Sequence, residues 1–95
     1  MIINKKLEQN TLFFAPVGRL DAMTAAEFEG ELMSSLEGAA SLVLDFKDVA
    51  YVSSAGLRVI LKAQKRMGNM KISGANAMVM EVFEITGFAD ILTFE

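Results

Sequence analysis

The sequence predicts one α/β domain, spanning residues 1–95, in which helices pack on a mixed β-sheet in the order ββαβαβαβ. Three observations predict this class. Ninety-five residues suffice for one hydrophobic core but not for two. Hydrophobic residues make up 53% of the chain, and several short, nearly continuous apolar runs are typical of strands covered on both faces. Segments between these runs repeat apolar residues every three or four positions, as amphipathic helices do.

The first two elements form a predicted β-hairpin. Residues 2–7 and 11–19 read as strands, and the short polar stretch between them is typical of a turn. Pro16 has no N–H to donate to a neighbouring strand. We therefore expect a bulge or an unpaired amide at this point of the second strand.

A first helix is predicted after the hairpin. Thr24, with Glu27 three positions later, fits a capping box, which makes Thr24 the N-cap. The apolar stripe of this helix recurs every four residues and consists of Phe28, Leu32 and Leu36. Gly38 is the predicted stop signal.

A buried strand and a second helix occupy the centre of the chain. Residues 41–46 form the strand, and residues 47–52 lead from it to two serines. The second helix covers residues 55–67 and ends at Gly68 and Asn69. Its predicted inward side chains are Leu57, Ile60, Leu61 and Gln64.

The last part of the chain predicts a strand, a helix and a closing strand. Residues 70–74 form the first of these, and Asn76 is suited to cap the helix that follows. The inner side of that helix carries Val79, Val82 and Phe83. Gly87 closes the helix, and residues 91–94 form the final strand.

The residue types that are missing restrict the chemistry. The chain contains no His and no Cys, which excludes imidazole and thiolate metal sites, Cys nucleophiles and serine–histidine triads. A net charge of -3 argues against direct nucleic-acid binding, which uses an excess of basic residues. No phosphate-binding loop of the GxxxxGK[ST] type occurs. The chain therefore has little catalytic equipment, and we expect no cofactor and no resident metal.

The sequence predicts neither membrane insertion nor export. No apolar run approaches the roughly 20 residues that span a bilayer. The first residues lack the apolar stretch of a secretory signal. The absence of Cys agrees with the cytoplasm, so we expect a cytoplasmic protein.

Two serines mark the transition from the apolar run to the second helix. Ser53 and Ser54 have two compatible interpretations. The first is a helix cap without regulation, because Ser is a common N-cap residue. The second is a phosphoacceptor, because the unpaired N–H groups and the positive dipole end of a helix N-terminus favour an anion.

Three segments carry a resemblance to a known family in their order and spacing: GRLDAMTA, SLVLDFKDVAYVSSAGLRVIL and FEITGFADIL. Over essentially the whole chain they resemble the STAS domain of bacterial anti-sigma factor antagonists. The resemblance implies a single STAS-like domain that binds an anti-sigma factor acting also as a serine protein kinase. In that family, phosphorylation of one serine releases the antagonist, and a metal-dependent protein phosphatase restores it.

The resemblance also implies site residues. Matching the Gly56–Leu57 pair places the phosphoacceptor at Ser54, and the loop aspartate of the family falls on Asp21. Ser53 stands where the best-known version has an acidic residue, which makes it a second candidate acceptor. The predicted partner-binding residues are Asp21, Thr24, Ser53, Gly56, Leu57, Arg58 and Lys62.

Other side chains have less specific interpretations. Arg58 and Lys62 start a basic helix face that is either solvated or pairs with acidic groups of a partner. Met23, Met78 and Met80 are candidates for an adaptable apolar surface, although Met more often fills a core.

Three oxygen-bearing side chains, Asp21, Asp45 and Asp48, are of the kind that Mg²⁺ prefers. The metal needed for phosphoryl transfer travels with the ATP of the kinase, so we assign none to this chain.

Two further classes of function compete with the switch. A constitutive accessory subunit of a transporter ATPase or signalling scaffold needs the helix surface but no acceptor hydroxyl. A hydrolase using Ser54 with a carboxylate lacks a histidine base. Nucleotide binding is implied by the resemblance alone, because no phosphate-cradling loop is present.

Overall fold

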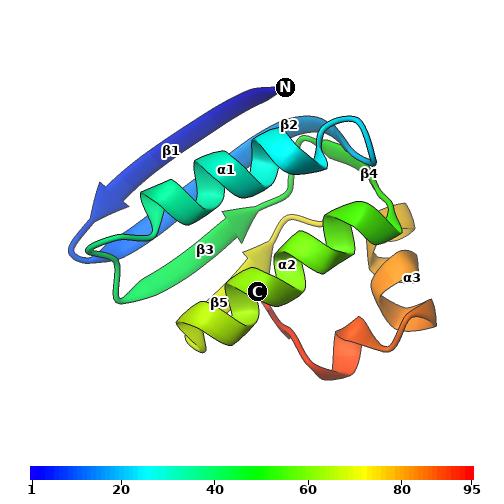
Figure 1. The fold of residues 1–95 in the computed structure, drawn as a ribbon. Coiled ribbons are helices and arrows are strands. Elements are labelled where there is room, and N and C mark those ends of the chain that lie inside the picture. The colour runs from blue at the N-terminus through cyan, green and yellow to red at the C-terminus, as the bar shows by residue number, and fades with distance from the viewer.

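The computed structural model describes residues 1–95 and confirms the α/β class, with helices packed on a six-stranded mixed sheet (Figure 1). In chain order the elements are β1 (Ile2–Glu8), β2 (Thr11–Leu20), α1 (Ala25–Ser35), β3 (Ser41–Asp45), β4 (Val49–Val52), α2 (Ser54–Met67), β5 (Met70–Ser73), α3 (Ala77–Ile85), the 3₁₀-helix η1 (Phe88–Asp90) and β6 (Thr93–Phe94). The strands are arranged β1-β2-β3-β5-β6, and β4 pairs with β2. No helix is both long and apolar enough to cross a membrane.

The long strand β2 organises the sheet. β1 runs antiparallel to it, and β3 and β4 run parallel to it. β3 pairs with residues 11–14 of β2, and β4 pairs with residues 18–20. The predicted order ββαβαβαβ is therefore one strand short, because residues 47–52 contain β4 rather than a connection.

The irregularity expected at Pro16 lies further along β2. Pro16 keeps regular register with Ile3 of β1, and the pairing shifts between Gly18 and Arg19 instead. Gly18 has φ +113°, a conformation open to glycine but rarely to other residues. Its N–H donates to the carbonyl oxygen of Asp48 at 2.9 Å, which joins β2 to the turn before β4.

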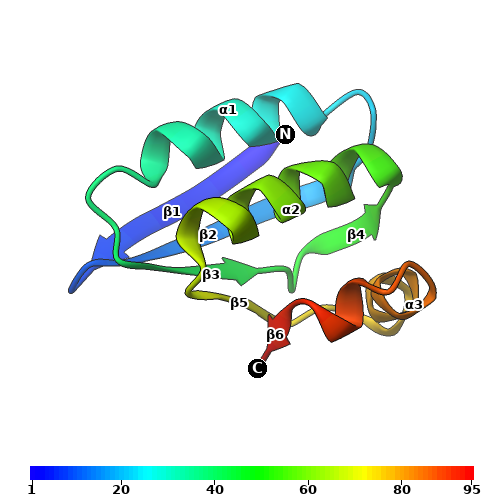
Figure 2. The same ribbon diagram turned by 60° about the horizontal axis from the view of Figure 1, so that its bottom comes forward.

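Helices α1 and α2 lie side by side on one face of the sheet (Figures 1 and 2). Their apolar stripes cover alternate strand residues, and Phe28 of α1 packs on Phe14 of β2 with ring centroids 5.8 Å apart. The most enclosed core side chains include Phe14, Phe28, Leu32, Leu42, Leu44 and Ile60. An ion pair of 3.0 Å between Lys62 and Glu29 joins the outer sides of the two helices.

Helix α3 lies beside β4 and η1 rather than with the other two helices (Figure 2). Phe83 anchors it, with ring centroids 6.5 Å from Phe46 and 5.4 Å from Phe94. The predicted cap is confirmed, because Asn76 Oδ1 accepts from the N–H of Val79 at 2.8 Å.

Strand β1 is the outer edge of the sheet. Nearly all of its side chains are exposed, including Leu7 at 54%. Besides its pairing with β2, it contacts α1 through an ion pair of 2.8 Å between Lys5 and Glu31. Charged side chains on an edge strand discourage pairing with another chain.

The predicted capping box does not form. Thr24 occupies the N-cap position of α1, but its hydroxyl makes no capping hydrogen bond. Glu27 pairs with the amino group of Met1 at 2.9 Å. The N–H of Ala25 instead donates to the carbonyl oxygen of Asp21 at 2.9 Å, so the preceding loop closes the end of the helix.

Candidate functional site

The ends of β2 and β4 bring two predicted site segments to one edge of the sheet. Leu20 and Val52 are partners in the parallel pair, and the N–H of Ser53 donates to the carbonyl oxygen of Leu20 at 2.8 Å. The loop that begins at Asp21 and the helix that begins at Ser54 therefore start side by side. Figure 1 shows the β2–α1 loop and the start of α2 at the same end of the molecule.

The two serines differ in accessibility. Ser54 is the first residue of α2 and is exposed. The Oγ atom of Ser53 is buried and has no hydrogen-bond partner. In this conformation Ser54 is therefore accessible from solvent, whereas the hydroxyl of Ser53 is not.

The cap interpretation holds for the position of Ser53 but not for a side-chain hydrogen bond. Ser53 occupies the N-cap position in an extended conformation, without a capping hydrogen bond from its hydroxyl. Its carbonyl oxygen accepts from the N–H of Leu57 at 2.9 Å and so begins the helical ladder.

The first turn of α2 carries an uncompensated positive dipole end. The first N–H groups of any α-helix have no partner within the helix. No acidic residue stands in this turn, and Arg58 follows it. An anion attached at Ser54 would therefore meet favourable electrostatics.

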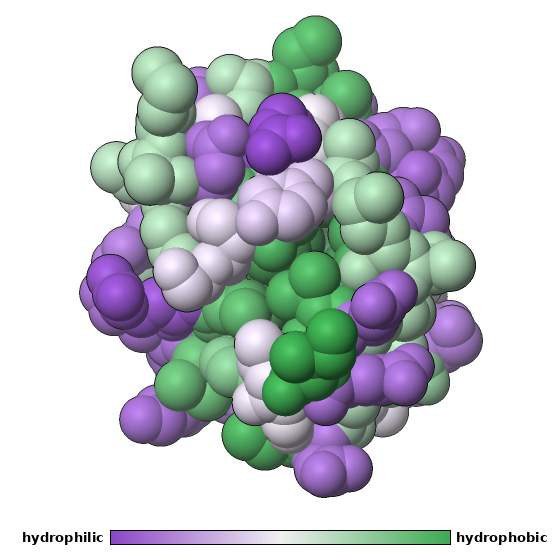
Figure 3. Space-filling view, turned by 90° about the vertical axis from the view of Figure 1, so that its right-hand side faces the viewer, coloured by the Kyte–Doolittle hydropathy of each residue, from purple (hydrophilic) through white to green (hydrophobic).

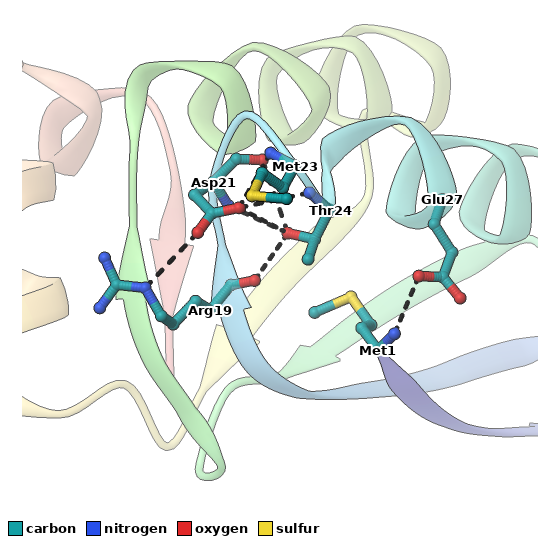
Figure 4. A network of polar contacts seen from close by, with 6 residues as sticks. All are labelled: Met1, Arg19, Asp21, Met23, Thr24 and Glu27. Atoms are coloured by element: carbon teal, nitrogen blue, oxygen red, sulfur yellow. Dashed lines mark hydrogen bonds and ion pairs between the residues drawn. The ribbon is translucent and has the colours of Figure 1, made fainter.

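The aspartate of the β2–α1 loop is fixed by backbone donors (Figure 4). Asp21 Oδ1 accepts from the N–H groups of Met23 at 3.0 Å and Thr24 at 3.3 Å, which makes an Asx-turn. Its Oδ2 lies 3.4 Å from Nε of Arg19. The Met23 N–H is the main cause that holds the pKa of this carboxyl below its ordinary value. Partial desolvation opposes it, and Thr24 and Arg19 lower the pKa further.

Thr24 braces the same loop from the other side. Its hydroxyl donates to the carbonyl oxygen of Arg19 at 2.6 Å and accepts from the N–H of Asp21 at 3.0 Å (Figure 4). Thr24 thus shapes the loop rather than capping α1.

Sequence reasoning missed two residues of this edge. The guanidinium of Arg19 lies 4.6 Å from the ring centroid of Tyr51, a cation–π contact across the β2–β4 pair. The register of β2 and β4 pairs Arg19 with Tyr51 and would have indicated this contact. It could not be predicted because the sequence did not indicate β4 as a strand.

Two of the predicted partner-binding residues are in the interior. Gly56 and Leu57 are buried, so they present no surface to a partner. A Cβ atom on Gly56 would stand 3.0 Å from both the Cβ and the carbonyl oxygen of Leu20. Glycine therefore lets α2 approach β2 closely. Arg58 and Lys62 are both exposed, and Lys62 forms an ion pair with Glu29.

No His, Cys, Asp or Glu side chains form a group of three that could hold a metal ion. Asp45 and Asp48 therefore do not form such a group with Asp21. Asp45 Oδ1 instead accepts from the N–H of Lys47 at 3.1 Å.

Two shallow hollows lie away from Ser54. One, of about 190 Å³, is lined by Thr11, Ser41, Leu42, Val43, Asn69 and Lys71, and the other, of about 200 Å³, by Asn4, Lys5, Lys6, Phe13 and Ala15.

Residues 3–95 match the STAS domain family. This chain belongs to the STAS domain family. The match covers nearly the whole chain and so confirms the family that the sequence resemblance indicated.

Named relatives of this STAS domain are anti-sigma factor antagonists. It is 37% identical over 79 residues to one such protein, BtrV of Bordetella bronchiseptica, covering 78% of this chain and 68% of BtrV. It is 28% identical over 94 residues to the anti-sigma-B factor antagonist of Bacillus subtilis, covering 95% of this chain and 86% of that protein.

A solved structure has the same fold. The anti-sigma factor antagonist SpoIIAA of Bacillus, in its unphosphorylated form, superposes with a TM-score of 0.82 at 12% identity, covering 99% of this chain and 88% of SpoIIAA. The phosphorylated form of SpoIIAA gives a TM-score of 0.74 at 11% identity, covering 99% and 91%.

Proposed function

We propose that this STAS domain is an anti-sigma factor antagonist whose partner binding is switched by phosphorylation of Ser54. Unphosphorylated, it sequesters an anti-sigma factor that is also a serine protein kinase. Phosphorylation releases it, and a metal-dependent protein phosphatase returns it to the binding form. The observation that carries this proposal is the exposed hydroxyl of Ser54 at the uncompensated N-terminus of α2.

The chemistry belongs to the kinase, and this chain supplies the acceptor. Ser54 Oγ attacks the γ-phosphorus of kinase-bound ATP and forms the new O–P bond. The bond to the bridging oxygen of ADP breaks, and the hydroxyl proton passes to a base of the kinase. Asp21 and Ser54 follow the neighbouring ends of β2 and β4. In this proposal, Asp21 helps to position the hydroxyl of Ser54 in the kinase site.

The charge of the phosphate explains why the free domain can carry it and why the bound partner is released. Phosphorylation adds about -1.5 to -2 charges at neutral pH. In the free domain this charge faces water and the N–H groups of the first turn of α2. In a complex, a surface packed on an uncharged serine has to desolvate the phosphate, which costs several kcal/mol where no cation pairs with it.

The direct test is phosphate mapping. The chain is incubated with the serine kinase of a partner-switching pathway and ATP, and the product is mapped by mass spectrometry. We expect one phosphate, on Ser54, with Ser54→Ala preventing it and Ser53→Ala leaving it in place. Modification at Ser53, or none while the kinase modifies its known substrate, would overturn the assignment and favour a constitutive accessory subunit.

A further inference from the structure

Met23 is the most exposed of the large apolar side chains, at 93%. It lies in the β2–α1 loop, at the sheet edge where α2 also begins. Single exposed apolar residues are common and need no explanation by themselves. Met23 differs from an ordinary surface residue in two respects. Hydrogen bonds hold its loop, and this loop starts at Leu20, whose carbonyl oxygen accepts from the N–H of Ser53, the residue before Ser54.

The backbone that carries Met23 is held on both sides. Its own N–H donates to Asp21 Oδ1 at 3.0 Å. The N–H of Asp21 donates to the hydroxyl of Thr24 at 3.0 Å, and that hydroxyl donates to the carbonyl oxygen of Arg19 at 2.6 Å. The methionine side chain is therefore solvent-exposed on a turn whose backbone is held by hydrogen bonds.

A fixed backbone favours Met23 as a binding residue. Ordering a loop on association costs free energy, and a loop already ordered avoids this cost. The Met side chain is unbranched and polarizable, so it adapts to apolar pockets of irregular shape.

The same end of the molecule combines apolar and polar groups. Figure 3 shows apolar side chains gathered among polar ones on the face that lies at the right of Figure 1. The β2–α1 loop, the start of α2 and α3 lie at this side in Figure 1. A surface that combines an apolar side chain with a serine that can be phosphorylated can bind a partner through the first and release it through the second.

We infer that Met23 is the apolar anchor through which this domain docks on the anti-sigma factor. The matching feature of the partner is an apolar pocket, large enough for a methionine side chain, next to the site that receives Ser54. This inference rests on the proposed function and adds the residue that supplies much of the affinity. Thr24 is a positioning residue, because it holds the loop without facing the partner.

The experiment measures the dissociation constant of the full chain for a purified anti-sigma factor, by isothermal titration calorimetry. Met23→Ala is expected to weaken binding about tenfold or more, as at other buried interface anchors. Met23→Leu, of similar volume, stays close to the unmodified protein. Leu7→Ala serves as the matched control, because Leu7 is 54% exposed near the opposite end of the sheet, and it leaves the affinity unchanged.

Positioning is tested with Thr24→Val and Thr24→Ser. The first removes the hydroxyl that braces the loop and weakens binding, and the second keeps the hydroxyl and restores binding. Thermal unfolding of each variant separates loss of contact from loss of fold, since truncating exposed Met23 leaves the midpoint in place.

The outcomes distinguish this inference from the proposed function. If the unmodified chain binds and Ser54→Asp abolishes binding while Met23→Ala has no effect, Met23 is no anchor and the switch stands. Equal losses in Met23→Ala and Leu7→Ala also overturn the anchor. If the unmodified chain binds no anti-sigma factor, the proposed function fails, and the anchor fails with it.

Discussion

The N–H of Ser53 donates to the carbonyl oxygen of Leu20 at 2.8 Å, and this bond fixes the start of α2 against the end of β2. Each is followed by a residue with a proposed role: Asp21 follows Leu20 and begins the β2–α1 loop, and Ser54 follows Ser53 and begins α2. The buried Oγ of Ser53 and the exposed position of Ser54 follow from the same junction. The pairing of β2 with β4 therefore determines which of the two serines is exposed.

Replacing the acceptor tests the switch by charge alone. Ser54→Ala keeps an uncharged residue and should retain partner affinity, whereas Ser54→Asp should weaken it. A cost of about 1.4 kcal/mol corresponds to tenfold, so a partly desolvated carboxylate predicts a loss of at least about tenfold. Calorimetric titration with the anti-sigma factor measures both. Ser34→Asp, exposed on α1, adds the same charge elsewhere, and an equal loss with it would contradict a local effect.

Two glycines in helices predict opposite changes in stability. Gly56→Ala places a Cβ atom 3.0 Å from the carbonyl oxygen of Leu20, so it should lower the free energy of unfolding by about 1–3 kcal/mol. Gly30→Ala meets nothing within 4 Å and should raise it by about 0.5–1 kcal/mol. Urea denaturation of both variants measures the pair. Equal effects would show that α2 has room to move away from β2.

The carboxyl of Asp21 predicts a dependence of stability on pH. Its pKa is lower in the folded protein than the ordinary 3.8, chiefly through the N–H of Met23. The carboxylate therefore stabilises the fold above pH 3.8, and this contribution is lost as pH falls through the folded-state pKa. Asp21→Asn should be less stable than the unmodified protein at pH 7, and the difference should shrink below about pH 4.

Thermal unfolding between pH 7 and pH 3 follows that difference. Asp48→Asn removes an exposed aspartate for which no side-chain bond is present, and so reports the effect of net charge alone. A constant difference between Asp21→Asn and the unmodified protein across this range would contradict the assignment.

Asn76 predicts a graded series at the start of α3. Its Oδ1 accepts from the N–H of Val79, and its Nδ2 donates to the carbonyl oxygen of Val49 at 3.1 Å. Asn76→Ala loses both bonds and should cost about 1–2 kcal/mol of unfolding free energy. Asn76→Asp keeps the cap and loses the bond to β4, so its free energy of unfolding should lie between those of the unmodified protein and Asn76→Ala. Chemical denaturation ranks the unmodified protein and the two variants by stability. An Asn76→Ala variant as stable as the unmodified protein would show that the cap does not stabilise α3.

Much of the fold was predictable because it depends on periodic burial. The stripe of Phe28 and Leu32 and the cap at Asn76 occur in the structure as predicted. Strand β4 was not predictable in the same way. Only residues 49–52 pair, a charged turn precedes them, and their partner is the far half of β2 rather than a neighbour in sequence.

Competition between polar groups explains the errors at the site. Thr24 and Glu27 have the spacing of a capping box, but the carboxylate and carbonyl of Asp21 take the nearby N–H groups. The amino group of Met1, distant in sequence, pairs with Glu27. The burial of Ser53 Oγ depends on the packing of α2 on β2, which a local pattern does not encode.

The exposed edge strand has a consequence for how the domain opens. β1 is held by β2 on one side and by few side-chain contacts, so its amide hydrogens should exchange with solvent sooner than those of β3 and β5, which are paired on both sides. Such fraying would leave the junction of β2, β4 and α2 closed. Opening of β1 would therefore leave the surroundings of Ser54 and Asp21 in place.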